Sequence, residues 1–230
     1  IHYVIWFEKE YKVSRKRFCL VPTGADDRIF IPNTITKKNT GEKFLVLYYG
    51  SFIPNHGVMK IAEAINQLRN RKDISFRFIG EGPEKSNFQS YIKRELLDNV
   101  EIIGWMSQRD LINQINHADI CLGAFGNTPQ SLMTIQNKIF ECMAMGKPVI
   151  TGDSPAVRTG LPPETVILCN RENATEISKA IVGLINDQKI LNKLSVNSLK
   201  VYNKYFSLKR LGEKLSAYLN VFVGKKSDPN

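Results

Sequence analysis

Two charged side chains in the segment NKIFECMAMGKPVI have the types and spacing of a ligand-binding pair. Lys138 and Glu141 are three residues apart, so a helix would place them on one face, while the apolar residues of the segment would point into a core. At a helix start that faces a ligand, Lys138 would meet a phosphate group and Glu141 would accept hydrogen bonds from ribose hydroxyls. The alternative is a surface ion pair that contributes little to stability.

Glycine-rich turns could bring backbone N–H groups close to such a phosphate. In YYGSFIPNHG, Gly50 and Gly57 lead from an apolar run into a helical pattern, and a helix N-terminus at the carboxyl end of a parallel strand is a common anion site. Gly80 and Gly82 occupy a similar turn, for which a purely structural role is the simpler interpretation. Neither turn matches G-x-G-x-x-G or the Walker A motif, so the sequence supports neither a dinucleotide site nor an ATPase.

The elements that must position these residues follow a regular alternation. Six short apolar runs, rich in β-branched and aromatic residues, predict strands that are buried on both faces of a parallel sheet. These runs cover residues 43–51, 74–82, 100–105, 118–125, 148–153 and 165–169. Helical patterns separate them at 58–71, 84–97, 107–118 and 134–146. Three more helices are expected after residue 173, so the sequence predicts an α/β fold: a doubly wound parallel sheet with C-terminal helices.

Composition narrows the class of protein. The chain has 230 residues, 43% of them hydrophobic, and a net charge of +10. Its four cysteines lie in apolar stretches without a CxxC pair, which indicates reduced thiols in a cytoplasmic protein and no metal site. The basic residues are spread out and are mostly expected on solvated faces, with peripheral contact with an anionic membrane as a further possibility. No nucleic-acid-binding signature and no apolar run of about 20 residues is present.

Five motifs, in order along the chain, resemble a known enzyme family. They are VPTGADDRIFIP, YYGSFIPNHGV, FRFIGEGPEK, VEIIGWMSQRDLINQINHADICL and NKIFECMAMGKPVI. The sequence from about residue 18 to about residue 220 resembles the C-terminal, donor-binding domain of GT-B glycosyltransferases of retaining family 4, the glycosyl transferases group 1. The last motif is a variant common among enzymes that build bacterial surface polysaccharides. The resemblance implies a Rossmann-like half of a GT-B fold and transfer of a sugar from a nucleoside diphosphate sugar to a glycan or lipid-linked acceptor, without a metal or another cofactor.

The resemblance also implies a nucleotide-sugar site spread over four segments. Its residues would be Gly50, Ser51, His56, Gly57, Trp105, Met106, Met133, Thr134, Ile135, Lys138 and Glu141. The loop at Gly50 would lie beside the donor diphosphate, and the backbone around Trp105 would meet the edge of the base. Residues 133–136 would run past the sugar, and Glu141 would contact the ribose.

Three positions depart from the family pattern. Met133 occupies the place of a glutamate near the sugar, Ser51 that of an arginine and His56 that of a lysine. The two usual cationic contacts to the diphosphate are therefore replaced, and we expect Lys138 and the helix dipole to take over that role. His56 could be protonated beside a phosphate or could be a solvent-exposed turn residue. Two other functions remain open: a non-catalytic binding module, whether a degenerate transferase domain or a basic nucleic-acid binder, and a related nucleotide-sugar epimerase.

The expected domain organisation has three parts. Residues 1–34 would be the end of an N-terminal domain and its crossover, residues 35–222 the donor-binding domain and residues 223–230 a polar tail. Catalytic residues are expected in the absent N-terminal domain, so the isolated chain should be inactive. His2 and His117 are poor candidates for a catalytic base.

Overall fold

The structure is a computed structural model that describes residues 1–32 and 42–224. The expected linker at 35–43, except for its last two residues, and the tail from residue 225 lie outside the described residues.

Six parallel strands form one sheet, as predicted from the apolar runs. They are β1 (Phe44–Tyr49), β2 (Ile74–Ile79), β3 (Val100–Ile103), β4 (Ile120–Leu122), β5 (Val149–Gly152) and β6 (Ile167–Cys169). Their order is β3-β2-β1-β4-β5-β6, with every neighbouring pair parallel. The chain moves outward in one direction from β1 to β3 and in the other direction from β4 to β6. The crevice at the carboxyl ends of β1 and β4 is therefore the switch point at which such sheets bind ligands.

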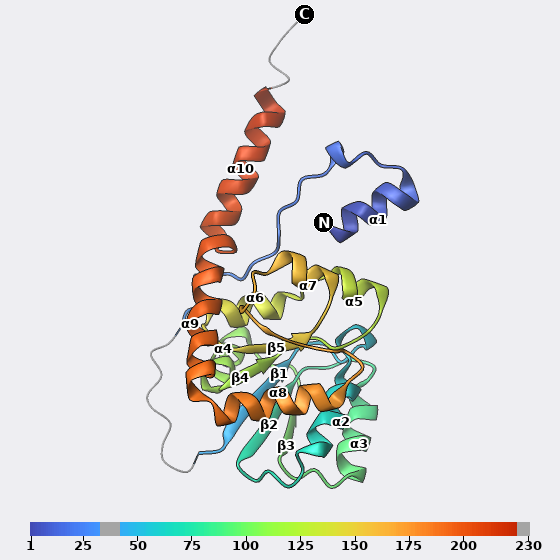
Figure 1. Cartoon of the computed structure of the whole chain (residues 1–230), viewed down its shortest axis with the longest axis vertical. Coiled ribbons are helices and arrows are strands. Elements are labelled where there is room, and N and C mark those ends of the chain that lie inside the picture. The colour runs from blue at the N-terminus through green and yellow to red at the C-terminus, as the bar shows by residue number, and fades with distance from the viewer. Residues whose placement is uncertain (33–41, 225–230) are drawn as a thin grey trace, which may run out of the picture.

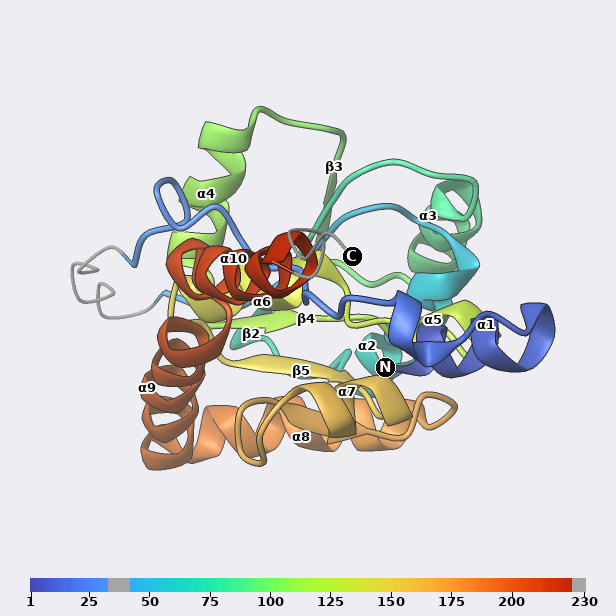
Figure 2. The ribbon, with the colours of Figure 1, turned by 90° about the horizontal axis from the view of Figure 1, so that it is seen from above.

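Helices cover both faces of the sheet (Figure 2). On one face, α2 (Val58–Gln67), α3 (Lys85–Arg94) and α8 (Ala174–Asn186) contribute to one buried apolar cluster. On the other face, α4 (Gln108–His117) and α6 (Asn137–Ala144) contribute to a second cluster. The long helix α9 (Gln188–Tyr205) contributes its first turns to the former cluster and its last turns to the latter. The first two helices after residue 173, α8 and α9, thus pack back on the sheet, as predicted, whereas α10 (Leu208–Gly224) does not.

Two short helices were not predicted from the sequence, and one predicted helix begins later than expected. The short helices are α5 (Pro129–Met133) and α7 (Pro155–Gly160), each with proline in its first turn and a hydroxyl cap from Thr128 or Ser154. Five or six residues are too few to show helical periodicity. The helix predicted over 134–146 begins at Asn137, because Thr134 and Gln136 have extended backbone angles.

The ends of the described chain extend from this body (Figure 1). The helix α1 (His2–Tyr11) contacts the body through His2 and Tyr3, which lie 3.0 and 3.3 Å from the hydroxyls of Thr159 and Thr134, and is followed by a 3-10 turn, Arg15–Arg17. The helix α10 (Leu208–Gly224) projects beyond the sheet. The segment between α1 and β1 is tied to the helical end of the body, because the Tyr202 hydroxyl donates to the Ala25 carbonyl at 2.9 Å. No described helix is both long and apolar enough to cross a membrane.

Candidate functional site

A buried amine lies where α6 begins. Lys138 is only 6% exposed, and its Nζ sits 4.0 Å from the centre of the Tyr48 ring. Among the described residues, this Nζ has no hydrogen-bond partner and forms no ion pair with Glu141. A Cβ atom added to Gly50 would lie 3.1 Å from it. The amine therefore points across the carboxyl end of β1 toward the glycine loop, and the surface ion pair considered from the sequence is wrong.

The packing of α6 explains why this lysine is buried. Its neighbours Ile139 and Phe140 are 0% and 1% exposed, so the first turn of the helix is held against the core as the sequence predicts. The lysine stem is buried with them, and only its end reaches the loop. Burial lowers the pKa of Lys138 from its ordinary value to about 7, although Cys142, Glu141 and Cys121 act in the opposite direction. A negatively charged ligand at the amine would supply the missing partner.

A carboxylate lies one turn further along α6. Glu141 Oε2 accepts a hydrogen bond of 2.8 Å from the Tyr49 hydroxyl. No hydrogen bond reaches Oε1 from any described residue, so this oxygen can accept from a ligand. Burial raises the pKa of Glu141, while the Tyr49 hydrogen bond and the nearby Lys138 lower it. Sequence reasoning missed Tyr49, because the last residue of an apolar strand is indistinguishable from a core residue by pattern alone.

The loop after β1 brings a histidine to the same place. His56 Nδ1 lies 2.7 Å from the Ser51 carbonyl, to which it donates, and the Tyr48 hydroxyl donates to the same carbonyl at 2.8 Å. Burial and the nearby Lys138 lower the pKa of His56 to about 4. Without a ligand the histidine is therefore neutral near pH 7, and it is only partly buried, so the solvent-exposed role considered from the sequence is wrong, while protonation beside a bound phosphate stays a prediction.

A pair of glycines lets the loops after β1 and β4 touch. Gly57 has a φ of +63°, and a Cβ on it would lie 2.5 Å from the Gly126 nitrogen. The Phe125 N–H donates to the His56 carbonyl at 2.9 Å. The loop at Gly50 is thus fixed against the second strand of the crevice.

The two helices that begin beside this group offer free N–H groups. Neither α2 nor α6 has a side-chain cap, and Oε1 of Gln136, the residue that precedes α6, is buried without a partner in the described structure. Side-chain caps close the starts of α4, α5, α7, α8 and α9; the capping residues are Ser107, Thr128, Ser154, Asn173 and Asp187. Uncapped N–H groups and the positive end of a helix dipole favour an anion in the crevice.

The structure does not bring all predicted site residues together. Met133, Thr134 and Ile135 line a cavity of about 880 Å³ beneath α1, which neither Lys138 nor Glu141 lines.

Trp105 and Met106 follow β3, which is two strands away from β1 in the sheet. Trp105 is 66% exposed just beyond β3, and Met106 packs against the core on the α6 side. No described contact joins either residue to Lys138 or Glu141. Their predicted contact with the base of the donor stays a prediction.

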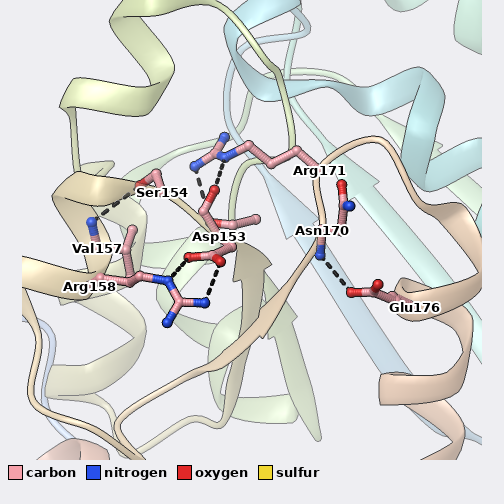
Figure 3. A network of polar contacts seen from close by, with 8 residues as sticks. Asp153, Ser154, Val157, Arg158, Asn170, Arg171 and Glu176 are labelled. Atoms are coloured by element: carbon pink, nitrogen blue, oxygen red, sulfur yellow. Dashed lines mark hydrogen bonds and ion pairs between the residues drawn. The ribbon is translucent and has the colours of Figure 1, made fainter.

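A second polar cluster lies at the carboxyl ends of β5 and β6 (Figure 3). The buried Arg171 donates to the carbonyls of Gly126, Gly152 and Asp153 at 2.6, 3.1 and 2.6 Å. The Asp153 carboxylate receives both arms of Arg158, at 2.7 and 2.5 Å. These groups satisfy one another, so the cluster fixes the loops rather than offering a vacant polar group. In the described residues no three His, Cys, Asp or Glu side chains lie together as metal ligands would.

Comparison with known proteins gives a consistent result for family and fold. A family model described as glycosyl transferases group 1 matches residues 43–187, more than half of the chain. An uncharacterized glycosyltransferase of Methanocaldococcus jannaschii is 26% identical over 188 residues, which are 78% of this chain and 49% of that protein. The chain thus spans about half the length of this relative.

Solved structures share the fold. Sucrose-phosphate synthase of Thermosynechococcus elongatus superposes with a TM-score of 0.79 at 19% identity, over 96% of this chain and 56% of that one. A glycosyltransferase of Rickettsia africae gives 0.76 at 20% identity, over 96% and 62%. Anabaena HepE in complex with UDP and glucose gives 0.76 at 15% identity, over 90% and 58%.

Proposed function

The chain belongs to the family of glycosyl transferases group 1, and on that premise we propose that it binds the nucleoside diphosphate sugar from which its parent enzyme transfers a sugar. Its Rossmann-like sheet is the C-terminal half of a GT-B fold. One observation carries the proposal: the buried Lys138 amine, which has no partner among the described residues, lies one turn from the Glu141 carboxylate at the switch point of the sheet.

Each group in the crevice suits one part of such a donor. The Lys138 ammonium and the free N–H groups of α2 and α6 would bind the diphosphate, and Glu141 would accept from the ribose hydroxyls. Gly50, Ser51 and the neutral His56 would pass beside the phosphates. As the bond to the sugar breaks, the same donors would stabilise the charge that develops on the leaving diphosphate. The proposed mechanism therefore requires no metal ion.

UDP is the first nucleotide to test. Anabaena HepE has been solved with UDP and with UDP-glucose. We extend this choice of base and sugar class to the present chain as part of the proposal. The acceptor is proposed to be a glycan or a lipid-linked sugar, held with the help of a second α/β domain, since the chain spans only 56–62% of the solved chains named above. The free cysteines support a cytoplasmic location, and the net charge of +10 suits peripheral contact with an anionic membrane.

Calorimetric titration with UDP, uridine and 2′,3′-dideoxy-UDP tests this proposal. We expect UDP to bind at least about tenfold more tightly than uridine, since one charged hydrogen bond contributes about 1.5–3 kcal/mol. Lys138→Met should remove most of that difference, whereas Lys147→Arg, on the far side of the core, should preserve it. Addition of EDTA should leave the affinity for UDP unchanged. Equal affinities for UDP and uridine, or no binding of either, would contradict the proposal.

A non-catalytic binding module is the second candidate, and a specific observation favours it. Met133, Ser51 and His56 replace three charged residues that the family pattern implies, and His56 is neutral near pH 7. Sugar transfer by the full-length parent enzyme distinguishes the two functions: a module of this kind would bind UDP but transfer nothing even with its second domain present.

A further inference from the structure

The carboxylate proposed for the ribose has a partner that no sequence motif identifies. The Tyr49 hydroxyl, from the last residue of β1, donates to Glu141 Oε2 at 2.8 Å. It also lies 3.1 Å from the Lys138 carbonyl and 3.4 Å from Cys142 Sγ. A hydroxyl has only one proton, and a carboxylate is a stronger acceptor than a carbonyl that already belongs to a helix. The carboxylate is therefore the main acceptor.

We propose that Tyr49 is a positioning residue for the donor: its buried hydroxyl holds the Glu141 carboxylate so that Oε1 faces the ribose hydroxyls. This inference rests on the proposed function of the crevice and adds to it the residue that orients the ribose contact.

The packing of Tyr49 makes it a rigid support. Its side chain is 5% exposed and lies in the apolar cluster between the sheet and α6. Its strand is paired through its whole length with β2, from Phe44 opposite Ile74 to Tyr49 opposite Ile79. Glutamate has several rotatable bonds, and a fixed hydrogen bond to one oxygen removes most of that freedom before a ligand arrives.

The position of Tyr49 in the chain connects the proposed phosphate contact at Lys138 with the proposed ribose contact at Glu141. Tyr48 lies under the Lys138 amine, Tyr49 holds Glu141, and Gly50 begins the loop beside the amine. Successive side chains of a strand point to opposite faces, so Tyr48 and Tyr49 reach the two charged residues of α6 from different sides of the sheet. A shift of β1 would therefore move the phosphate contact and the ribose contact together.

Tyr49→Phe removes the hydroxyl and keeps the ring, which makes it a sharp test. We expect its affinity for UDP to fall about five- to tenfold, the range of one ordinary hydrogen bond, because Tyr49 acts through Glu141 and does not itself contact the nucleotide. Its affinity for 2′,3′-dideoxy-UDP should stay within about twofold of the wild type, because that ligand lacks the hydroxyls that Glu141 accepts. Tyr202→Phe is the matched control, since it also removes a buried hydroxyl, one that donates to the carbonyl of Ala25 and not to a residue of the crevice. It should leave both affinities unchanged.

The pH profile of UDP binding gives a second readout that a purely structural role would not move. The titratable groups facing Glu141 are Tyr49 from β1 and, from its own helix, Lys138 and Cys142. The Tyr49 hydrogen bond favours the charged carboxylate, so its loss should raise the pKa of Glu141 further. Binding that needs the carboxylate is lost as pH falls through this pKa, and in Tyr49→Phe the loss should begin at a higher pH.

The outcomes separate this inference from the proposed function. If Tyr49→Phe weakens both nucleotides equally, or weakens neither while Glu141→Ala weakens UDP, then Tyr49 does not position the carboxylate and the inference is wrong. If wild-type protein binds neither nucleotide, the proposed function itself is wrong.

Discussion

Two lysines of this chain are equally buried but have opposite surroundings. Lys138 and Lys147 are each 6% exposed. Lys147 donates to the carbonyls of Asn116 and Ala118 at 2.7 and 2.9 Å, whereas no described residue accepts from Lys138. A buried cation without an acceptor lowers stability. The difference indicates that Lys147 supports the fold and that Lys138 serves a ligand.

Replacing Lys138 should therefore stabilise the protein while weakening the site. The pKa of Lys138 is lowered to about 7 in the folded chain, so between pH 7 and its ordinary value the unfolded chain binds more protons. The loss of stability caused by burying the Lys138 amine is therefore greatest below pH 7, and it disappears as pH rises toward the ordinary pKa of lysine. We expect Lys138→Met to raise the melting temperature more at pH 6 than at pH 9, measured by calorimetry.

The second buried lysine provides the control for this prediction. Lys147→Met would leave two carbonyls without their donor, so it should lower the melting temperature at both pH values. A melting temperature for Lys138→Met below that of the wild type at pH 6 would show that the amine has a stabilising partner after all.

The same titration should make nucleotide binding depend on pH. A diphosphate favours the protonated amine, so the complex takes up a proton when the free amine is neutral. Above pH 7 the affinity for UDP should fall, approaching about tenfold for each pH unit. Titration calorimetry between pH 7 and pH 9 measures this slope. In Lys138→Met the slope should be lost, and a slope that persists there would assign the proton to another group.

At the scale of elements, the sequence predicts the alternation of strands and helices well but places the loops between them poorly. The apolar runs predicted all six strands correctly, because a short run of apolar residues indicates a strand that is buried on both faces of a parallel sheet. The start of α6 was misplaced, since the turn from an extended segment into a helix at Asn137 leaves no change in hydrophobic pattern. Met133, Thr134 and Ile135, which the family resemblance grouped with Lys138, line a cavity that neither Lys138 nor Glu141 lines. The pair Lys138 and Glu141 was found because helical spacing alone relates them.

Two glycines offer a matched test of how the loops are held. Gly57 has a φ of +63° and faces the backbone of Gly126 with no room for a Cβ, so Gly57→Ala should destabilise the fold by several kcal/mol, of order 3. Gly183 lies in α8 with nothing within 4 Å of its Cβ position, so Gly183→Ala should stabilise by about 0.5–1 kcal/mol. Urea denaturation measures both. A mild effect at Gly57 would mean that the two loops can separate.

At the scale of the whole molecule, the described chain carries apolar surface at one end. The exposed apolar side chains of α1 and of the residue that precedes it are Ile1, Tyr3, Ile5, Trp6, Phe7 and Tyr11. Those of α10 include Leu215, Leu219 and Val221. Both helices extend from the same end of the body, beyond the helices that cover the sheet (Figure 1).

The isolated chain should bind UDP but transfer no sugar. We propose that closure of a second α/β domain over the crevice holds the acceptor and excludes water. Incubation of the chain with UDP-glucose and a range of glycan and lipid-linked acceptors, followed by mass spectrometry, tests this expectation. Transfer by the isolated chain to any acceptor would contradict it, and the full-length parent enzyme serves as the positive control.

The lengths of the strands have a consequence for association between chains. The inner strands β1 and β2 have six residues each and the inner strand β4 has three, while the outermost strands β3 and β6 have only four and three. On β3 the charged Glu101 is exposed and pairs with Arg77 at 2.6 Å. An outer strand is the template on which another polypeptide could add by backbone pairing. Parallel sheets form slowly, and their edge strands can pair with other chains while the sheet forms. The short edge strands of this sheet and the charge on β3 therefore protect the chain from aggregation as it folds.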